Sequence, residues 1–414
     1  METKLRKSIN ATFYNGIWDI IIKSLTTGPL LTSYALCLGM GNIMLGFLQS
    51  VVPFSNLLHL LVSNFLEKGK SPKKIACLAS IISRPFLILI AASFFLKDST
   101  TGKILFISSY TFFYLLVAVT GGAFWPWCKK LVPKAVTISF FAQRIRYILL
   151  IKIITVTTVT TWLAFLPKHQ QSLDFLLYSL FLTIAFVFGI LYTLTLFQME
   201  DVRLEYQSII PFHQKIRIII KQKSFLKFLF NIGLYNFTLS FFIPFCIVFL
   251  LKALGLSTPI SIMFSVGSSC IDILFINFWR KYAQKKSVAQ MIFRASFFFV
   301  FSSILLIYLS IYQIGTYPIL IIAFISIGIA NSGANLAISD ASIAFVPSKM
   351  SSVYISLMNI GRFGFSGLGS FMAGITLEIL EGIIPNKWTA FFIISAILFS
   401  IAATRIKQIK PIEE

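Results

Sequence analysis

The chain has 414 residues, of which 57% are hydrophobic and only 12% are charged. Soluble domains carry roughly 25% charged residues, so the composition excludes an ordinary soluble protein. The formal net charge of +22 would indicate a nucleic-acid partner in a soluble protein. In a membrane protein, basic loops on one side of the bilayer account for such a charge, and we expect no nucleic-acid partner.

Apolar segments of membrane-spanning length follow one another along the whole chain. A helix of about 20 apolar residues crosses the hydrocarbon core of a bilayer. The sequence therefore predicts an all-α integral membrane protein with twelve transmembrane helices. The expected spans cover residues 11–36, 43–66, 74–96, 103–125, 147–166, 174–197, 225–250, 259–279, 288–310, 318–345, 351–377 and 388–404.

Most lysines and arginines lie in every second loop between these spans. Because basic loops stay on the cytoplasmic side, the pattern predicts that both termini are cytoplasmic in a multi-pass protein of the cell inner membrane. The basic N-terminus followed by an apolar run could indicate a signal peptide. That run is too long, however, and contains Asp19 and Lys23, so we interpret it as a retained first span.

The longest polar stretch, Gln198–Lys223, separates six expected spans from the next six. A cytoplasmic connector between two equal hydrophobic halves is typical of duplicated transporters. We therefore predict an N-terminal six-helix bundle at 1–199, a connector at 200–223 and a C-terminal six-helix bundle at 224–414.

The residues that membrane-embedded enzymes need are not clustered in this sequence. Three histidines (His59, His169 and His213) are far apart, and the five cysteines are scattered without metal-ligand spacing. Paired carboxylates and a phosphate-binding glycine loop are missing as well. We expect no catalytic residues, no metal and no cofactor, and hence neither an enzyme nor an ATP-driven pump.

The turn after the second span contains Glu67 and Lys68, followed by Lys73 and Lys74. It resembles the motif after the second span of the major facilitator superfamily, with Ser63 in place of the motif's glycine and a longer segment between the bases. The resemblance covers essentially the whole chain. It implies two six-helix bundles (6+6) around a central cavity and transport by alternating access. In that family the turn acts as a charge-based latch, which makes these four charged residues gating candidates.

Further segments are similar to one bacterial branch of this superfamily. The fifth span of its proton-antiporting drug exporters is rich in glycine and proline, whereas Thr155–Thr161 contains neither. This difference speaks against drug export. The similar segments are Phe124–Trp127 and Leu131–Pro133 with Gln143-Arg144 as the loop between spans four and five, Pro244-Phe245 with Leu254–Ser257, and Ala330–Ala337.

Asp19 and Lys23 lie four residues apart in the first span, on one face of the expected helix. Ionisable groups at membrane depth usually face protein or a water-filled cavity. The pair is either a structural ion pair or an element of solute binding and proton coupling. The resemblance favours the second interpretation, because the first span lines the cavity in that family.

Polar residues in other spans are candidates for the cavity wall or for gating. Asn331 and Asn335 share a helix face, where they could bind a polar solute or join helices. Asp272 and Arg362 are expected to form an ion pair with a structural or gating role, since spans eight and eleven are neighbours in the family, and contact with the solute is the alternative. The remaining candidates are Tyr110, Tyr114, Tyr235 and Asn236 for the cavity, Asp340 for the cavity or its cytoplasmic mouth, Arg84 next to Pro85 for a kink with a salt partner, and Lys152 in span five.

Together these observations predict a secondary active transporter of a small polar solute, anionic or zwitterionic, that works as a proton symporter. Its partners would be the solute, H⁺ as coupling ion and the lipid bilayer, and we expect a monomer. The alternative is a proton-antiporting exporter of drugs and other amphipathic solutes. A flippase for a lipid-linked substrate and a membrane-embedded enzyme fit the sequence less well.

Overall fold

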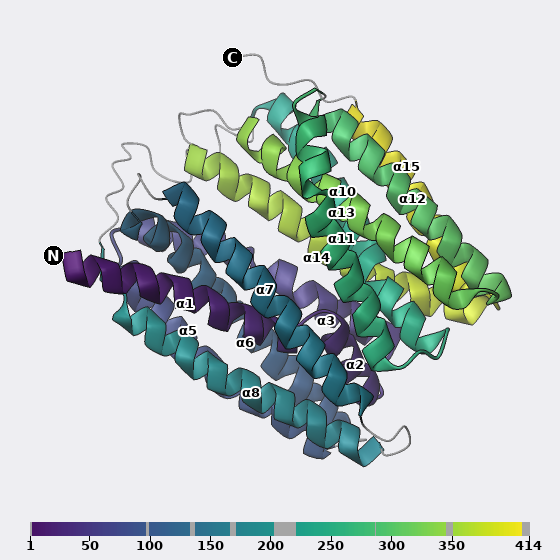
Figure 1. The fold of residues 1–414 in the computed structure, drawn as a ribbon, viewed down its shortest axis with the longest axis horizontal. Helices are drawn as coiled ribbons and strands as arrows, with labels where there is room; N and C mark the ends of the chain where they lie inside the picture. Colours follow the sequence, from purple (N-terminus) through teal and green to yellow (C-terminus); the bar gives the residue numbers. More distant parts are fainter. Residues whose placement is uncertain are drawn as a thin grey trace. The chain divides into compact units, whose positions relative to one another are not determined.

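The computed structural model describes residues 2–96, 99–132, 137–165, 171–202, 221–285, 287–344 and 351–407, and the regular structure in these ranges is helical (Figure 1). Twelve spans in the described ranges are long and apolar enough to cross a membrane. The predicted all-α membrane architecture with twelve transmembrane helices is thereby confirmed. Many large apolar side chains lie exposed on these helices, as expected where helices face lipid.

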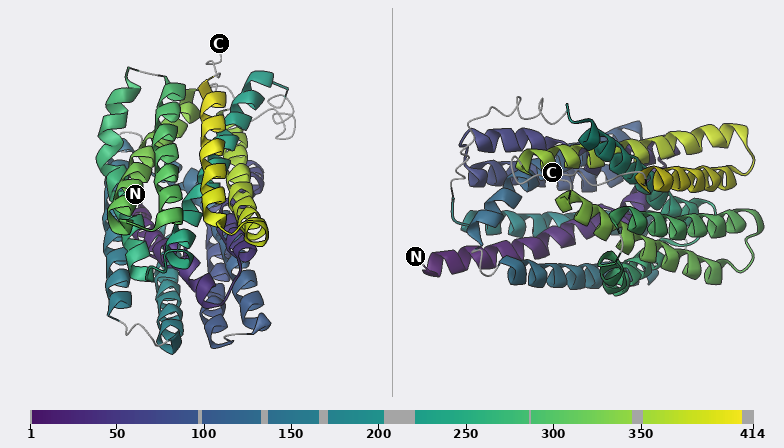
Figure 2. Two further views of the ribbon diagram at one scale, coloured as in Figure 1. Left: turned by 90° about the vertical axis from the view of Figure 1, so that its right-hand side faces the viewer. Right: turned by 90° about the horizontal axis from the view of Figure 1, so that it is seen from above.

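The first compact unit comprises Met1–Met40 and Phe54–Ile209. In it, α1 packs against α7 and α8, while α5 packs against α6 and α8 and α4 against α6. The helices of this unit run side by side in the views of Figure 2. They are α1 (Glu2–Thr26), α2 (Pro29–Cys37), α4 (Leu58–Glu67), α5 (Pro72–Ala92) with the short 3-10 turn η1 (Ser93–Leu96), α6 (Thr100–Leu131), α7 (Thr137–Ala164) and α8 (Gln171–Gln198).

The second compact unit comprises Gly41–Pro53 and Ile210–Glu414. Here α10 packs against α14 and α15, α12 against α13 and α15, and α11 against α13. The predicted connector at 200–223 lies mostly outside the described residues. The helices are α3 (Asn42–Ser55), most of which belongs to this unit, α10 (Lys223–Lys252), α11 (Thr258–Ala283), α12 (Val288–Tyr312), α13 (Thr316–Ala344), α14 (Ser351–Ile383) and α15 (Lys387–Lys407).

The first two spans are each interrupted, although a continuous helix was expected for both. In span one, Gly28 has a left-handed backbone (φ 67°), and Pro29 begins the next helix. Glycine tolerates this conformation and proline suits a first helical position, which explains the break. In span two the helix is interrupted at Asn56 and Leu57, after Pro53. Pro53 has no backbone N–H and therefore weakens the turn that precedes the interruption. At the interruption the chain forms tighter turns, with hydrogen bonds from the Leu57 N–H to the Phe54 carbonyl at 3.0 Å and from the His59 N–H to the Asn56 carbonyl at 3.2 Å.

Several other helices are longer than expected, among them α7, which begins at Thr137 and therefore includes Gln143-Arg144, also interpreted as part of a loop. Phe124–Trp127 was interpreted as part of a loop, but α6 continues through it to Leu131. Phe124 and Trp127 are buried, and the Trp127 indole donates a hydrogen bond to the Glu200 carbonyl at 2.8 Å. Burial of these aromatic rings stabilises the helix beyond Pro126. Likewise, α14 extends past the expected end at 377 to Ile383.

Aromatic rings fill the core of the second unit. The Phe299 and Phe399 rings stack at 4.6 Å, and those of Phe241 and Phe391 at 4.9 Å. Each such pair contributes about 0.5–1.5 kcal/mol beyond the burial of its area. The core of the first unit also contains buried aromatic rings, and in addition it contains Arg84 and Arg144, which at 6% and 5% exposure are the two charged residues in the buried class among those described.

Candidate functional site

The Asp19–Lys23 pair of α1 is formed as the four-residue spacing predicts. Lys23 Nζ lies 2.7 Å from Asp19 Oδ2, and the two side chains are 46% and 33% exposed. One charge therefore compensates the other, while both side chains keep an accessible surface. Such a pair can still exchange its partner for a solute group or a proton.

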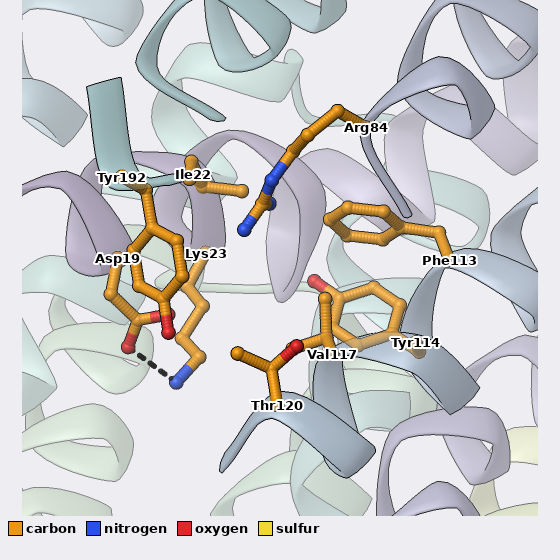
Figure 3. A pocket seen from close by; sticks show the side chains of 9 residues that line it. All are labelled: Asp19, Ile22, Lys23, Arg84, Phe113, Tyr114, Val117, Thr120 and Tyr192. Atoms are coloured by element: carbon orange, nitrogen blue, oxygen red, sulfur yellow. Dashed lines mark hydrogen bonds and ion pairs between the residues drawn. The ribbon is translucent and has the colours of Figure 1, made fainter. Parts of the chain in front are cut away.

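A small pocket in the first unit is built around this pair (Figure 3). Four helices contribute to it, and all its lining residues belong to the first unit. Its free space of about 10 Å³ has room for roughly one water molecule. The lining residues are Asp19, Ile22 and Lys23 of α1, Arg84 of α5, Phe113, Tyr114, Val117 and Thr120 of α6, and Tyr192 of α8.

Arg84 points from α5 into the space between Tyr192 and Phe113 (Figure 3). Its Nη2 atom lies 3.0 Å from Ser80 Oγ, and its Nε atom lies 3.4 Å from Thr193 Oγ1. The guanidinium carbon is 4.8 Å from the Tyr192 ring centroid. The salt partner expected for Arg84 is not found among the described residues, so the kink-and-salt-partner interpretation is wrong in this respect.

Both tyrosines predicted for span four are buried on α6. The Tyr114 hydroxyl lies 2.6 Å from the Thr26 hydroxyl, which links α6 to the end of α1. The Tyr110 ring packs 4.8 Å from the Tyr114 ring, and Tyr110 is not among the pocket residues. Of the two, the structure thus places Tyr114 in the pocket.

Sequence reasoning missed Tyr192 and Thr120 as pocket residues, and it missed the hydroxyl groups that hold Arg84. These residues have no local signal, because each is one of several uncharged polar residues scattered in an apolar span. Arg144 of α7 was also missed as a buried cation. Its Nε atom donates to the Thr12 carbonyl at 3.3 Å, and its guanidinium packs on the Trp125 ring at 5.2 Å.

The second-unit candidates do not gather in the described part of that unit. Tyr235 is buried, with its ring 6.4 Å from Phe399, and Asn236 donates to the Ile232 carbonyl of its own helix. Asn331 is partly buried and Asn335 exposed on α13. The side chain of Asp340 lies outside the described residues.

The ion pair expected between Asp272 and Arg362 stays a prediction. Arg362 Nε is buried without a hydrogen-bond partner among the described residues. The two residues lie on helices with different main neighbours: α11, which carries Asp272, packs against α13, whereas α14, which carries Arg362, packs against α10.

The four basic-turn candidates differ in their contacts. Lys73 Nζ donates to the carbonyls of Phe197 and Met199 at 2.9 and 2.6 Å, and thereby caps the end of α8. Lys68 and Lys74 are exposed, and Glu67 is partly buried. Their gating role stays a prediction, as does the role of Lys152, which is partly buried on α7.

A polar cluster in the second unit had no sequence signal. Asn42 Nδ2 donates to Glu378 and Glu381 at 3.0 and 2.7 Å, and Lys252 donates to Asn42 Oδ1 at 2.9 Å. Lys387 pairs with Glu381 at 2.7 Å. These interactions compensate the carboxylates of α14, which explains why the helix continues past the expected end of the span.

No family model matches the chain, and no curated protein matches it in sequence.

Several solved structures match the chain in fold. The chain is similar to the nucleoside transporter NupG (D323A mutant), with 16% identity, a TM-score of 0.74 and coverage of 96% of this chain and 98% of that chain. It is similar to a D-xylose–proton symporter, with 10% identity, a TM-score of 0.73 and coverage of 99% and 97%. A bacterial homologue of the iron transporter ferroportin matches at 11% identity and a TM-score of 0.70, with 98% coverage of each chain.

These similarities span nearly the whole of each chain. They show that the chain has the same fold as these proteins, which is the fold that the resemblance implied. The proteins compared here are transporters of small solutes or metals rather than enzymes.

Proposed function

We propose that this protein is a secondary active transporter that carries a small polar solute, anionic or zwitterionic, together with a proton. The observation that supports it most is the Asp19–Lys23 pair at the wall of a pocket that also contains Arg84. Charged groups at membrane depth are costly, so they are usually retained where a solute or ion uses them. An exporter of amphipathic drugs would need a more apolar site than this one.

Proton coupling is assigned to Asp19. As a carboxylate Asp19 holds Lys23, and on protonation it would release the ammonium group. Solute binding and protonation would then bias the same conformational equilibrium, which is what coupling requires. Following the basic-loop pattern, we place the protein in the inner membrane as a monomer with both termini in the cytoplasm, and we assign the two bundles to 1–199 and 224–414.

The solute can be found by a thermal-shift screen of the purified protein against a metabolite library. A bound ligand stabilises the folded state by mass action. A hit is then tested for uptake into proteoliposomes, with a pH gradient imposed in either direction to distinguish import from export.

Asp19→Asn tests the coupling assignment. We expect the rate of uptake driven by the pH gradient to fall at least about tenfold, which corresponds to ~1.4 kcal/mol in the barrier to transport, while exchange of labelled for unlabelled solute continues. Asp201→Asn is the matched control, because this carboxylate belongs to the same unit and accepts its hydrogen bonds from Ser71, away from the pocket. Unchanged pH dependence in Asp19→Asn would rule out Asp19 as the coupling group.

A further inference from the structure

Arg84 is held at membrane depth by neutral groups alone. It lies twelve residues after Pro72, the first residue of α5, which corresponds to roughly 18 Å along the helix. The side chain is 6% exposed, and its hydrogen bonds go to the hydroxyls of Ser80 and Thr193. Those bonds use Nη2 and Nε, whereas Nη1 makes no hydrogen bond to the described residues.

The carboxylate that lines the same pocket already has a partner. Asp19 pairs with Lys23 at 2.7 Å, and no ion pair joins Arg84 to any described residue. With one acid and two bases, the pocket carries one surplus positive charge. The Tyr192 and Phe113 rings, at 4.8 and 6.0 Å from the guanidinium carbon, offset this charge only in part.

The surrounding helices are shaped for this arginine. A Cβ atom at Gly189 of α8 would lie 2.7 Å from Arg84 Cδ, so a side chain there would displace the arginine. Gly189 leaves room for the Arg84 side chain, and the two hydroxyl contacts hold its guanidinium in place. A buried cation that is positioned in this way but left without an anion points to an anion supplied from outside.

We propose that Arg84 binds the anionic group of the transported solute, and that the solute is a net anion bearing a carboxylate or phosphate group. This inference rests on the proposed transport function and specifies its substrate class. While Asp19 is ionised it neutralises Lys23, so one negative charge on the solute brings the pocket to neutrality before the proton binds. A zwitterion would leave the surplus charge in place. The planar guanidinium suits either oxyanion, because both accept two parallel N–H hydrogen bonds.

The test uses acetate and inorganic phosphate as probes on the purified full-length protein in detergent, at constant ionic strength, with acetamide as the neutral isostere of acetate. Thermal melting is measured for the wild type and for Arg84→Gln. We expect the oxyanions to raise the melting temperature of the wild type and the apparent Kd to rise at least about tenfold in Arg84→Gln, as for loss of a charge-assisted hydrogen bond.

Phosphate also stabilises proteins non-specifically, so the decisive quantity is the difference between the two proteins. Arg144→Gln is the matched control. It removes a buried arginine of the same unit that does not line the pocket, and it should keep the oxyanion effect whatever its own melting temperature.

Gly189→Ala supplies a second variant in case Arg84→Gln does not fold. It keeps the arginine but displaces it, and it should weaken the oxyanion effect as well. The proposal is overturned if acetate and phosphate stabilise the wild type no more than acetamide and chloride do. It is also overturned if either pocket variant retains the full effect.

Failure of this proposal can be told apart from failure of the proposed function. If a neutral or cationic solute is carried with Asp19-dependent proton coupling, transport stands and the anion assignment falls. If oxyanions bind in an Arg84-dependent way but no solute crosses the membrane, the anion site stands and the transport function falls.

Discussion

Hydroxyl groups, rather than counter-charges, connect the different helices around the pocket. The Thr26–Tyr114 contact at 2.6 Å joins α1 to α6, and the Ser80 and Thr193 hydroxyls, which lie 2.7 Å apart, join α5 to α8. Hydroxyls can both donate and accept, so such contacts can hold several helices without adding charge. The charge of the pocket is therefore set by Asp19, Lys23 and Arg84 alone.

Tyr114→Phe tests the first of these contacts. The change removes one buried hydrogen bond and leaves the Thr26 hydroxyl bonded to the Ile22 carbonyl of its own helix. We expect a loss of about 1 kcal/mol of stability, measured by thermal or chemical unfolding in detergent. Tyr308→Phe on α12, where the side chain is exposed, is the control and should change stability by less than ~0.5 kcal/mol. Equal effects of the two changes would contradict this account.

At residue scale, the Asp19–Lys23 pair could be predicted from sequence because a four-residue spacing on a helix brings two side chains together locally. The environment of Arg84 could not. Its hydroxyl partner Thr193 is more than a hundred positions away and lies on α8, and the spacing of residues does not indicate which polar atom will face which helix. The salt partner assumed for Arg84 was wrong for this reason.

The basic turn after span two contacts the C-terminal end of α8 in this structure. Lys73 reaches the last carbonyls of α8, which have no partner within that helix, and its positive charge suits the negative end of the helix dipole. Ser71 binds Asp201 just beyond the same helix end. The contacts described for this turn therefore support a helix cap.

Lys73→Ala and its neighbour Lys74→Ala form a matched pair. We expect Lys73→Ala to destabilise the protein by about 1.5–3 kcal/mol, since it removes two hydrogen bonds from a charged group. Lys74 is exposed, so Lys74→Ala should lower the stability by less than ~0.5 kcal/mol. The measurement compares the melting temperatures of the two variants, and an equal loss of stability in both would show that the cap contributes nothing.

At element scale, hydropathy predicts the existence of the spans well and their continuity poorly. The break at Gly28-Pro29 carried a sequence signal that the surrounding apolar run outweighed. The extension of α14 carried none. It depends on Asn42 and Lys387 reaching Glu378 and Glu381, and Asn42 is distant in sequence.

Across the molecule, buried aromatic rings occur in the cores of both units, but the buried charges do not. Arg84 and Arg144, the two charged residues of the buried class among those described, are both in the first unit. The sequence predicts candidate solute ligands in both halves, because polar residues occur in both. Only the packing of each unit shows which of these residues share a pocket, so the two halves could not be ranked beforehand.

Span two is divided between the units as well. Its first part, through Pro53, packs with the second unit, where Gly46 of α3 lies against Gly374 of α14. The remainder of the span belongs to the first unit and packs on α6. The interruption at Asn56 and Leu57 lies just after this division, so a single membrane crossing contributes to both compact units.

Gly374→Ala tests the close contact of α3 and α14. A Cβ atom at 374 would lie 2.9 Å from the Gly46 Cα atom, and backbone cannot yield as a flexible side chain can. We expect a loss of about 1–3 kcal/mol, seen as a lower melting temperature. Gly382→Ala on the same helix meets no atom within 4 Å and should leave stability unchanged or slightly raise it. A Gly374→Ala protein as stable as Gly382→Ala would contradict the contact.

The surplus charge beside Arg84 has an electrical consequence. The vacant pocket carries one positive charge, and a monoanion that enters together with one proton leaves that charge unchanged. Moving one elementary charge through the bilayer field changes its energy by about 2.3 kcal/mol per 100 mV. An inside-negative voltage would therefore favour the inward-facing state of the loaded and of the vacant carrier alike, so that it would assist entry of the solute and slow the return of the empty carrier.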